Sequence, residues 1–84
     1  MKDQTRLKKA ELLRRCGEDE KASKILTSLL VVDDVNIIAQ SNYNLGIIAE
    51  HPERGKRNIP KAIQHYQTAL DLGYAEAADR KSTR

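Results

Sequence analysis

The order of apolar and polar residues follows a helical period in the N-terminal half of the chain. Apolar residues return every third or fourth position from Asp3 to Cys16 and again from Ala22 to Leu30. This spacing places them on one face of an α-helix. Gly17 stands where a left-handed turn would end the first helix. The predicted apolar faces consist of Leu7, Ala10, Leu13 and Cys16 in the first helix and of Ala22, Ile25, Leu26, Leu29 and Leu30 in the second.

The segment from Leu29 to Ile38, LLVVDDVNII, is open to two interpretations. It is rich in β-branched residues, which favour strands, so one alternative is a short β-strand. We prefer a helix that ends near Asp33-Asp34, a turn at these aspartates, and a third helix from about Val35 to Glu50. The buried face of that third helix would hold Ile38, Leu45, Ile48 and Ala49.

A basic segment interrupts the pattern between His51 and Asn58 and predicts a loop. Pro52 and Gly55 both disfavour a continuous helix there. Asn58 is a suitable N-cap residue for a fourth helix, and Pro60 in its first turn loses no helical hydrogen bond. The polar tail after Gly73 predicts a short capping helix. The fourth helix itself would bury Ile59, Ala62, Ile63, Tyr66, Ala69 and Leu70 and end at Gly73.

Composition limits the class of protein. A chain of 84 residues forms one small domain, and 39% hydrophobic with 32% charged residues favours an ordered helical protein over a disordered chain. The net charge of +3 permits contact with phosphates or acidic proteins without requiring either. One cysteine allows no intramolecular disulfide, and no apolar stretch resembles a signal peptide or a membrane span. We therefore expect a cytoplasmic protein.

Small residues recur at related positions in the two halves of the chain. In the first half Ala10 is followed by Lys21-Ala22, and in the second half Gly46 is followed by Lys61-Ala62. Small side chains allow two antiparallel helices to approach closely. We therefore predict two helix-turn-helix units, with Ala10 packed against Ala22 in one and Gly46 packed against Ala62 in the other.

These positions resemble those of two related helical repeat families. The first unit is similar to a tetratricopeptide repeat at Ala10, Leu13, Gly17, Ala22, Leu26 and Leu29. The second is similar to a Sel-one-like repeat at Ala39, Tyr43-Asn44-Leu45-Gly46, Lys61-Ala62, Tyr66, Ala69 and Gly73, and departs from it at Ala49, Pro52 and Arg54. The resemblance implies one all-α domain of the α-solenoid type over residues 1–84, with two antiparallel helix-turn-helix repeats. Repeat one spans about 3–34, repeat two about 35–73, and the capping tail 74–84.

No combination of residues in the sequence predicts catalysis, a cofactor or a metal site. His51 and His65 are not spaced with Cys16 as zinc ligands, and a zinc site needs about four ligands. Gly55-Lys56 lacks the other residues of a phosphate-binding loop. The acidic pairs stand at helix starts and turns, where capping explains them. We therefore expect a non-enzymatic protein that uses no metal or cofactor.

The predicted function is that of a protein–protein interaction module, an adaptor or scaffold that binds a peptide or helix on a concave surface. In the families that the chain resembles, the first helix of each repeat lines this surface. Asn44 is attractive because an amide can donate to and accept from a peptide backbone, although an ordinary helix-surface asparagine explains it equally well. Tyr43 and Ile47 would form an apolar ledge or be buried by a second subunit. Carried over by position, the predicted contacts are Leu7, Glu11, Arg14, Arg15, Gln40, Tyr43, Asn44 and Ile47.

Two alternatives stay open. Basic clusters favour a small regulator that binds nucleic acid, with Arg54, Lys56, Arg57 and Lys61 as candidate phosphate contacts. Three tyrosines and no Trp or Phe leave few side chains for base stacking, so a protein partner is preferred. In the other alternative the chain is the assembly cap of a larger solenoid. Because two repeats leave apolar end faces exposed, we also predict a homodimer.

Overall fold

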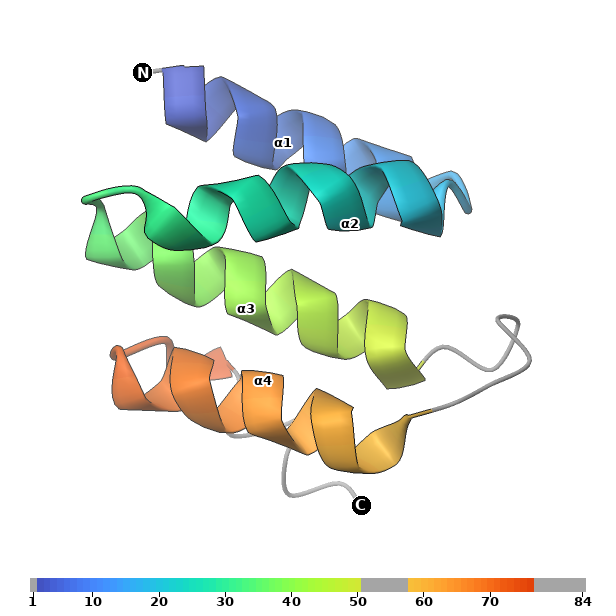
Figure 1. The fold of residues 1–84 in the computed structure, drawn as a ribbon. Coiled ribbons are helices and arrows are strands. Elements are labelled where there is room, and N and C mark those ends of the chain that lie inside the picture. Colours follow the sequence, from blue (N-terminus) through green and yellow to red (C-terminus); the bar gives the residue numbers. More distant parts are fainter. Residues whose placement is uncertain (1, 51–57, 77–84) are drawn as a thin grey trace.

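The protein is built from helices throughout the residues that its computed structural model describes, which are 2–50 and 58–76 (Figure 1). Each α-helix runs antiparallel to the one before it, so the chain forms two consecutive helical hairpins. The predicted all-α fold class is confirmed. The elements are α1 (Lys2–Arg15), α2 (Asp19–Ser28), the 3-10 helix η1 (Leu29–Val31), α3 (Val35–Glu50) and α4 (Ile59–Asp71).

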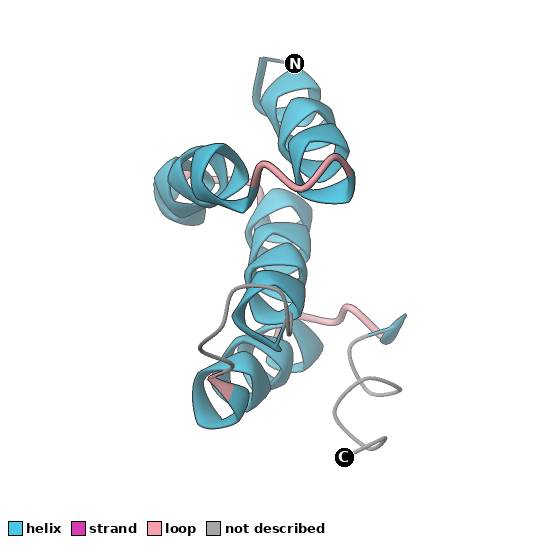
Figure 2. Ribbon diagram, turned by 90° about the vertical axis from the view of Figure 1, so that its right-hand side faces the viewer, coloured by secondary structure: helices cyan, strands magenta, loops and turns pink. Residues whose placement is uncertain are grey.

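The helices form two staggered layers when they are seen nearly end-on (Figure 2). α1 and α3 lie in one layer and α2 and α4 in the other, and α3 contacts α1, α2, η1 and α4. This central position explains why nine of the 16 residues of α3 are buried. A helix that is covered on several sides does not show one clean apolar stripe. Of its predicted buried face, Leu45 and Ile48 are buried, whereas Ile38 and Ala49 are half-buried.

Two glycines end the helices α1 and α4, as the sequence predicts. Gly17 and Gly73 have φ angles of +88° and +100°, in the left-handed region that residues with a Cβ atom rarely adopt. The amide of Glu18 reaches back and donates to the carbonyl oxygen of Leu13 at 2.8 Å, and the residue after Gly73 makes the equivalent bond at 2.9 Å. These bonds satisfy carbonyl groups that have no partner inside the helix.

The segment from Leu29 to Ile38 contains no strand, so the strand interpretation is wrong. η1 continues from α2, the Asp33-Asp34 pair forms the turn, and α3 follows. The carboxylate of Asp34 accepts hydrogen bonds from the amides of Asn36 and Ile37, at 3.0 and 3.4 Å. This capping satisfies amides at the start of α3 and fixes where that helix begins.

Apolar side chains collect in two clusters that share α3. The first cluster lies between α1, α2, η1 and α3, and the second lies between α3 and α4. Cys16 does not join the first cluster but is exposed, because the chain leaves α1 after Arg15 and enters the turn at Gly17. This corrects the predicted apolar face of α1. The buried members are Leu7, Ala10, Ala22, Leu26, Leu29, Ile37, Leu45 and Ile48 in the first cluster and Ile47, Ala62, Tyr66 and Ala69 in the second.

The small residues lie where the helices of each hairpin meet. Ala10 and Ala22 are fully buried in the first cluster, in agreement with the predicted close packing of α1 and α2. In the second hairpin Gly46 and Ala62 are also buried, and the ring of Tyr66 lies directly over Gly46. A Cβ atom added to Gly46 would lie 2.5 Å from Cε1 of that ring, far inside ordinary van der Waals distance. The ring therefore occupies the space that a side chain at this position needs.

Replacing Gly46 with alanine tests this packing. The change favours helix formation by about 1 kcal/mol, but it displaces the buried Tyr66 ring, and overpacking of this kind costs about 1–3 kcal/mol. We expect a net decrease in the free energy of unfolding, measured by urea denaturation with circular dichroism. The control Gln64→Ala, at an exposed position of α4, should change this free energy by less than about 0.5 kcal/mol. A Gly46→Ala protein as stable as the wild type would contradict the contact.

Candidate binding surfaces

The surface predicted to bind a partner is formed by α1 and α3, and hydrogen bonds join the two helices there. Nε of Arg14 donates to Oδ1 of Asn44 at 2.8 Å. Nδ2 of Asn44 donates to the backbone oxygen of Gln40 at 2.9 Å and, over a longer distance of 3.4 Å, to Oε2 of Glu11. Asn44 therefore connects the positively charged Arg14 and the negatively charged Glu11 of α1 to the middle of α3.

Asn44 has a structural role that differs from the predicted one. Its side chain is 2% exposed, and its amide is engaged both as donor and as acceptor. It therefore lacks the free amide that contact with a peptide backbone requires, and we correct that prediction. Its effect on the surface is indirect, because it holds Arg14 and Glu11, which are both partly exposed, in fixed positions.

Two apolar members of the predicted contact set belong to the core. Leu7 is 1% exposed in the first cluster, and Ile47 is 7% exposed in the second. We remove both from the contact set, because side chains that pack between helices do not reach the surface that a partner touches. The members that a partner can reach are the exposed Arg15 and the partly exposed Glu11, Arg14, Gln40 and Tyr43.

Tyr43 lies between two other tyrosines. Its ring centroid is 6.0 Å from that of Tyr66 on α4 and 5.0 Å from that of Tyr74, which follows α4. The contact with Tyr74 is edge-on, an arrangement that aromatic rings prefer. Tyr74 packs against the second cluster, so Ile47 is buried by residues of its own chain and needs no second subunit to cover it.

Tyr74 is a surface residue that the predicted contact set omits. Its hydroxyl donates to the carboxylate of Glu76 at 3.3 Å. Burial raises the pKa of Tyr74 to about 12, with further contributions from the charge of Glu76, this hydrogen bond, and the nearby Tyr43 and Glu11. The hydroxyl therefore keeps its proton at physiological pH. Its position after Gly73 is a usable sequence signal, because the second residue beyond a helix end often packs back onto the helix.

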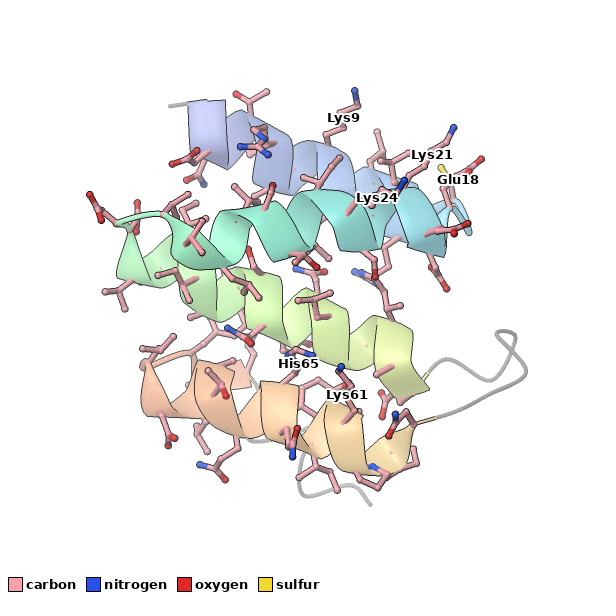
Figure 3. The ribbon with its side chains drawn as sticks, viewed as in Figure 1. Lys9, Glu18, Lys21, Lys24, Lys61 and His65 are labelled. Carbon is pink, nitrogen blue, oxygen red and sulfur yellow. The ribbon has the colours of Figure 1, made fainter. Side chains whose placement is uncertain are left out.

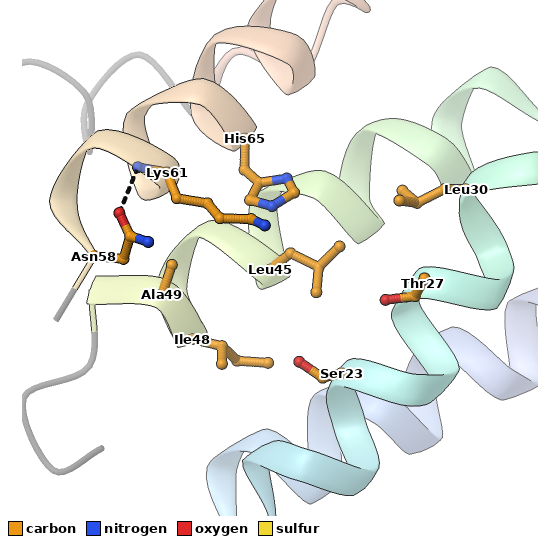
Figure 4. A pocket seen from close by; sticks show the side chains of 9 residues that line it. All are labelled: Ser23, Thr27, Leu30, Leu45, Ile48, Ala49, Asn58, Lys61 and His65. Atoms are coloured by element: carbon orange, nitrogen blue, oxygen red, sulfur yellow. Dashed lines mark hydrogen bonds between the residues drawn. The ribbon is translucent and has the colours of Figure 1, made fainter. Parts of the chain in front are cut away.

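α2 and α4 flank an open groove whose floor is formed by α3 (Figure 4). Its volume is about 430 Å³. Ligand sites in proteins commonly measure about 300–1,000 Å³, so the groove is large enough to receive side chains of a partner. The lining consists of Ser23 and Thr27 from α2, Leu30 from η1, Leu45, Ile48 and Ala49 from α3, and Asn58, Lys61 and His65 from α4 and its cap.

The start of α4 is fixed beside this groove in the predicted way. Oδ1 of Asn58 accepts a hydrogen bond from the amide of Lys61 at 3.1 Å, and Pro60 stands in the first turn. Lys61 and His65 are four residues apart and therefore share one face of α4. Figure 4 shows both side chains in the groove.

His65 is held in one orientation by Asn42 on α3. Nδ2 of Asn42 donates to the backbone oxygen of Ile38 at 3.0 Å, so Oδ1 of Asn42 is the acceptor for Nδ1 of His65, also at 3.0 Å. In the neutral ring this bond places the proton on Nδ1 and the lone pair on Nε2. Burial, followed by the charge of Lys61, lowers the pKa of His65. The ring is half-buried, and its orientation is set by the core asparagine.

Basic side chains on α1 and α4 differ in how far they are engaged within the chain. On α1, Arg6 donates a hydrogen bond to the hydroxyl of Ser28, and Arg14 is bound to Asn44. Lys61 is exposed on α4 near His65, whereas Lys21 and Lys24 on α2 are accompanied by the acidic Glu18 (Figure 3). The remaining predicted sites lie outside the described residues: Arg54, Lys56, Arg57, His51 and the part of the capping tail from residue 77 onward.

Known proteins and common site types do not assign a role to either surface. Comparison of the chain with known proteins finds no matching family, no similar curated protein and no similar solved structure. Within residues 2–50 and 58–76, no three His, Cys, Asp or Glu side chains are grouped so that they could hold a metal ion. The helices in this part of the chain also lack the length and apolar character needed to cross a membrane.

The predicted homodimer stays a prediction. The exposed large apolar side chains that it could use, among the described residues, are Leu12, Val31 and Val35.

Replacing Asn44 with alanine tests the network between α1 and α3. The change removes the bonds to Gln40 and to the charged Arg14, and a hydrogen bond to a charged group contributes about 1.5–3 kcal/mol to the free energy of unfolding. Chemical denaturation measures this loss. Asn36→Ala, at an exposed position in the first turn of α3, is the matched control and should stay within about 0.5 kcal/mol of the wild type. Equal stabilities of the two variants would contradict a structural role for Asn44.

The environment of His65 predicts a pH dependence of stability. Because its pKa is lowered in the folded state, the folded protein favours the neutral ring while the unfolded chain binds a proton near the ordinary pKa of 6.5. The contribution of His65 to stability is therefore complete above about pH 6.5 and is lost as the pH falls through the lower pKa of the folded state. An NMR titration of the imidazole signals, assigned with His65→Gln, should give this lower pKa. Lys61→Ala should move it part of the way back; a pKa at or above 6.5 would contradict the structure.

Proposed function

We propose that this chain is a non-catalytic protein-interaction module, acting as an adaptor or scaffold, which binds a peptide or helix on the surface of α1 and α3. The observation that supports this function is the network in which Asn44 fixes Arg14 and Glu11 across the two hairpins. A surface whose side chains are already ordered loses less conformational entropy when a partner binds. The network therefore favours binding over a purely structural face.

The surface offers charged and aromatic contacts. Arg14 uses Nε for Asn44, and its two terminal nitrogens have no hydrogen-bond partner among the described residues. These nitrogens favour a carboxylate on the partner, while Glu11 favours a basic residue beside it. The rings of Tyr43 and Tyr74 add aromatic area next to these charges. The proposed contact set is Glu11, Arg14, Arg15, Gln40, Tyr43 and Tyr74.

We also propose that the two hairpins are repeats of the tetratricopeptide and Sel-one-like type. Their antiparallel helices, the buried Ala10, Ala22, Gly46 and Ala62, and the left-handed turn at Gly17 agree with the positions on which the resemblance rests. In these families the first helix of each repeat lines the partner-binding surface, which supports the choice of α1 and α3.

Peptide selection with matched charge-reversal variants tests the proposed function. A displayed library of random dodecapeptides is selected on the wild-type chain, and synthetic copies of the recovered peptides are titrated by calorimetry. Arg15→Glu, at an exposed position on the proposed surface, should weaken binding of a share of these peptides by about tenfold or more, because it replaces an attraction with a repulsion. The control Lys9→Glu makes the same charge change on α1, where the side chain points away from α2 (Figure 3). If no recovered peptide distinguishes Arg15→Glu from Lys9→Glu, the proposed surface is wrong.

A further inference from the structure

The groove between α2 and α4 combines a cation, a neutral imidazole and an apolar floor. Figure 4 shows the amine of Lys61 next to the ring of His65, close to Leu45 on the floor. Lys61 forms no ion pair with any residue in 2–50 or 58–76. His65 uses Nδ1 for its bond to Asn42, so Nε2 is left for a ligand. An ammonium group without a counter-ion at the edge of a groove favours a ligand that carries negative charge.

The α2 wall adds hydroxyl groups to the groove. The hydroxyls of Ser23 and Thr27 line the groove one helical turn apart, a rise of about 6 Å along α2. In an extended peptide, the backbone groups that point to one edge come from every second residue and are about 6.6 Å apart. The spacing of the two hydroxyls is close to this distance.

We propose that the groove binds an extended peptide segment in which an acidic side chain stands next to an apolar one. The carboxylate lies between Nζ of Lys61 and Nε2 of His65, and the apolar side chain packs on Leu45, Ile48 and Ala49. Charge complementarity selects this occupant, because the described residues that line the groove include Lys61 and His65 and no acidic side chain. The groove is separate from the surface of α1 and α3, so this inference stands independently of the proposed function.

Binding of this peptide is coupled to protonation of His65. In the free protein the ring is kept neutral by burial and by Lys61. Asn42, which binds Nδ1, and the groove residues contributed by α2 and η1, Ser23, Thr27 and Leu30, carry no group that titrates near neutral pH. A carboxylate placed at Nε2 favours the charged ring, so the complex takes up a proton. Affinity therefore rises as the pH falls from about 8 to about 6.

Peptide selection against a groove-blocked variant tests the inference. The library of random dodecapeptides is first depleted on Thr27→Arg, in which a long side chain enters the groove from an exposed position of α2, and then selected on the wild-type chain at about pH 6. We expect the recovered peptides to share Asp or Glu next to an apolar residue. Changing that acid to its amide, or introducing Lys61→Glu, should weaken binding about tenfold or more, whereas Lys9→Glu should leave it unchanged.

The pH dependence provides the second readout. Calorimetry should show tighter binding at about pH 6 than at about pH 8 for the wild type, and His65→Gln should remove this difference while its amide can still donate to Asn42. Circular dichroism verifies that each variant is folded. The inference is overturned if no recovered peptide needs the open groove, if the recovered peptides lack an acidic residue, or if Lys61→Glu binds them as the wild type does. A different occupant of the groove would also overturn the inference. This outcome is shown if no peptide binds there and Thr27→Arg abolishes either self-association of the chain or its binding to oligothymidylate, a probe for nucleic acid. If no peptide binds the groove while peptides that depend on Arg15 still bind the chain, this inference fails and the proposed function does not.

Discussion

The contact between the ring of Tyr66 and the backbone of Gly46 is the constraint on which the second half of the molecule depends. The ring, which extends from α4, lies so close to α3 that no side chain fits at position 46. The opposite side of α3 packs on α1, α2 and η1, so this one helix carries both apolar clusters. In a chain of 84 residues with a thin core, a helix buried on two sides is an efficient use of apolar surface.

Two asparagines on α3 connect this core to the two surfaces in the same way. Each uses Nδ2 to donate to the backbone oxygen four residues earlier and Oδ1 to accept from a side chain on another helix. Asn44 holds Arg14 on α1, whereas Asn42 holds His65 on α4. Since the side-chain amides of Asn42 and Asn44 are nearly buried, the core and not the solvent sets the orientation of His65 and Arg14. α3 therefore positions side chains that are proposed to bind partners both on the surface of α1 and α3 and in the groove between α2 and α4.

Local signals were sufficient to predict where the helices begin and end. Gly17, Gly73 and Asn58 act on the few residues around them, so their effect can be inferred without knowing the tertiary structure. The roles of residues on α3 depend on contacts that are distant in sequence. A helical period cannot show that Asn44 is bound to Arg14, 30 residues away, or that Leu7 and Ile47 face neighbouring helices instead of a partner. The groove was missed for the same reason, because it exists only once α2 and α4 are placed on either side of α3.

The arrangement of the tyrosines gives the molecule an internal optical reporter. The chain contains no Trp or Phe, and all three of its tyrosines meet in one group formed by α3, α4 and the turn that follows. Near-ultraviolet absorption and intrinsic fluorescence therefore arise from the second hairpin alone, while the far-ultraviolet signal averages over every helix. The near-ultraviolet signal thus observes one half of the molecule and the far-ultraviolet signal observes both halves, and their transitions coincide only when the two hairpins unfold as a single cooperative unit.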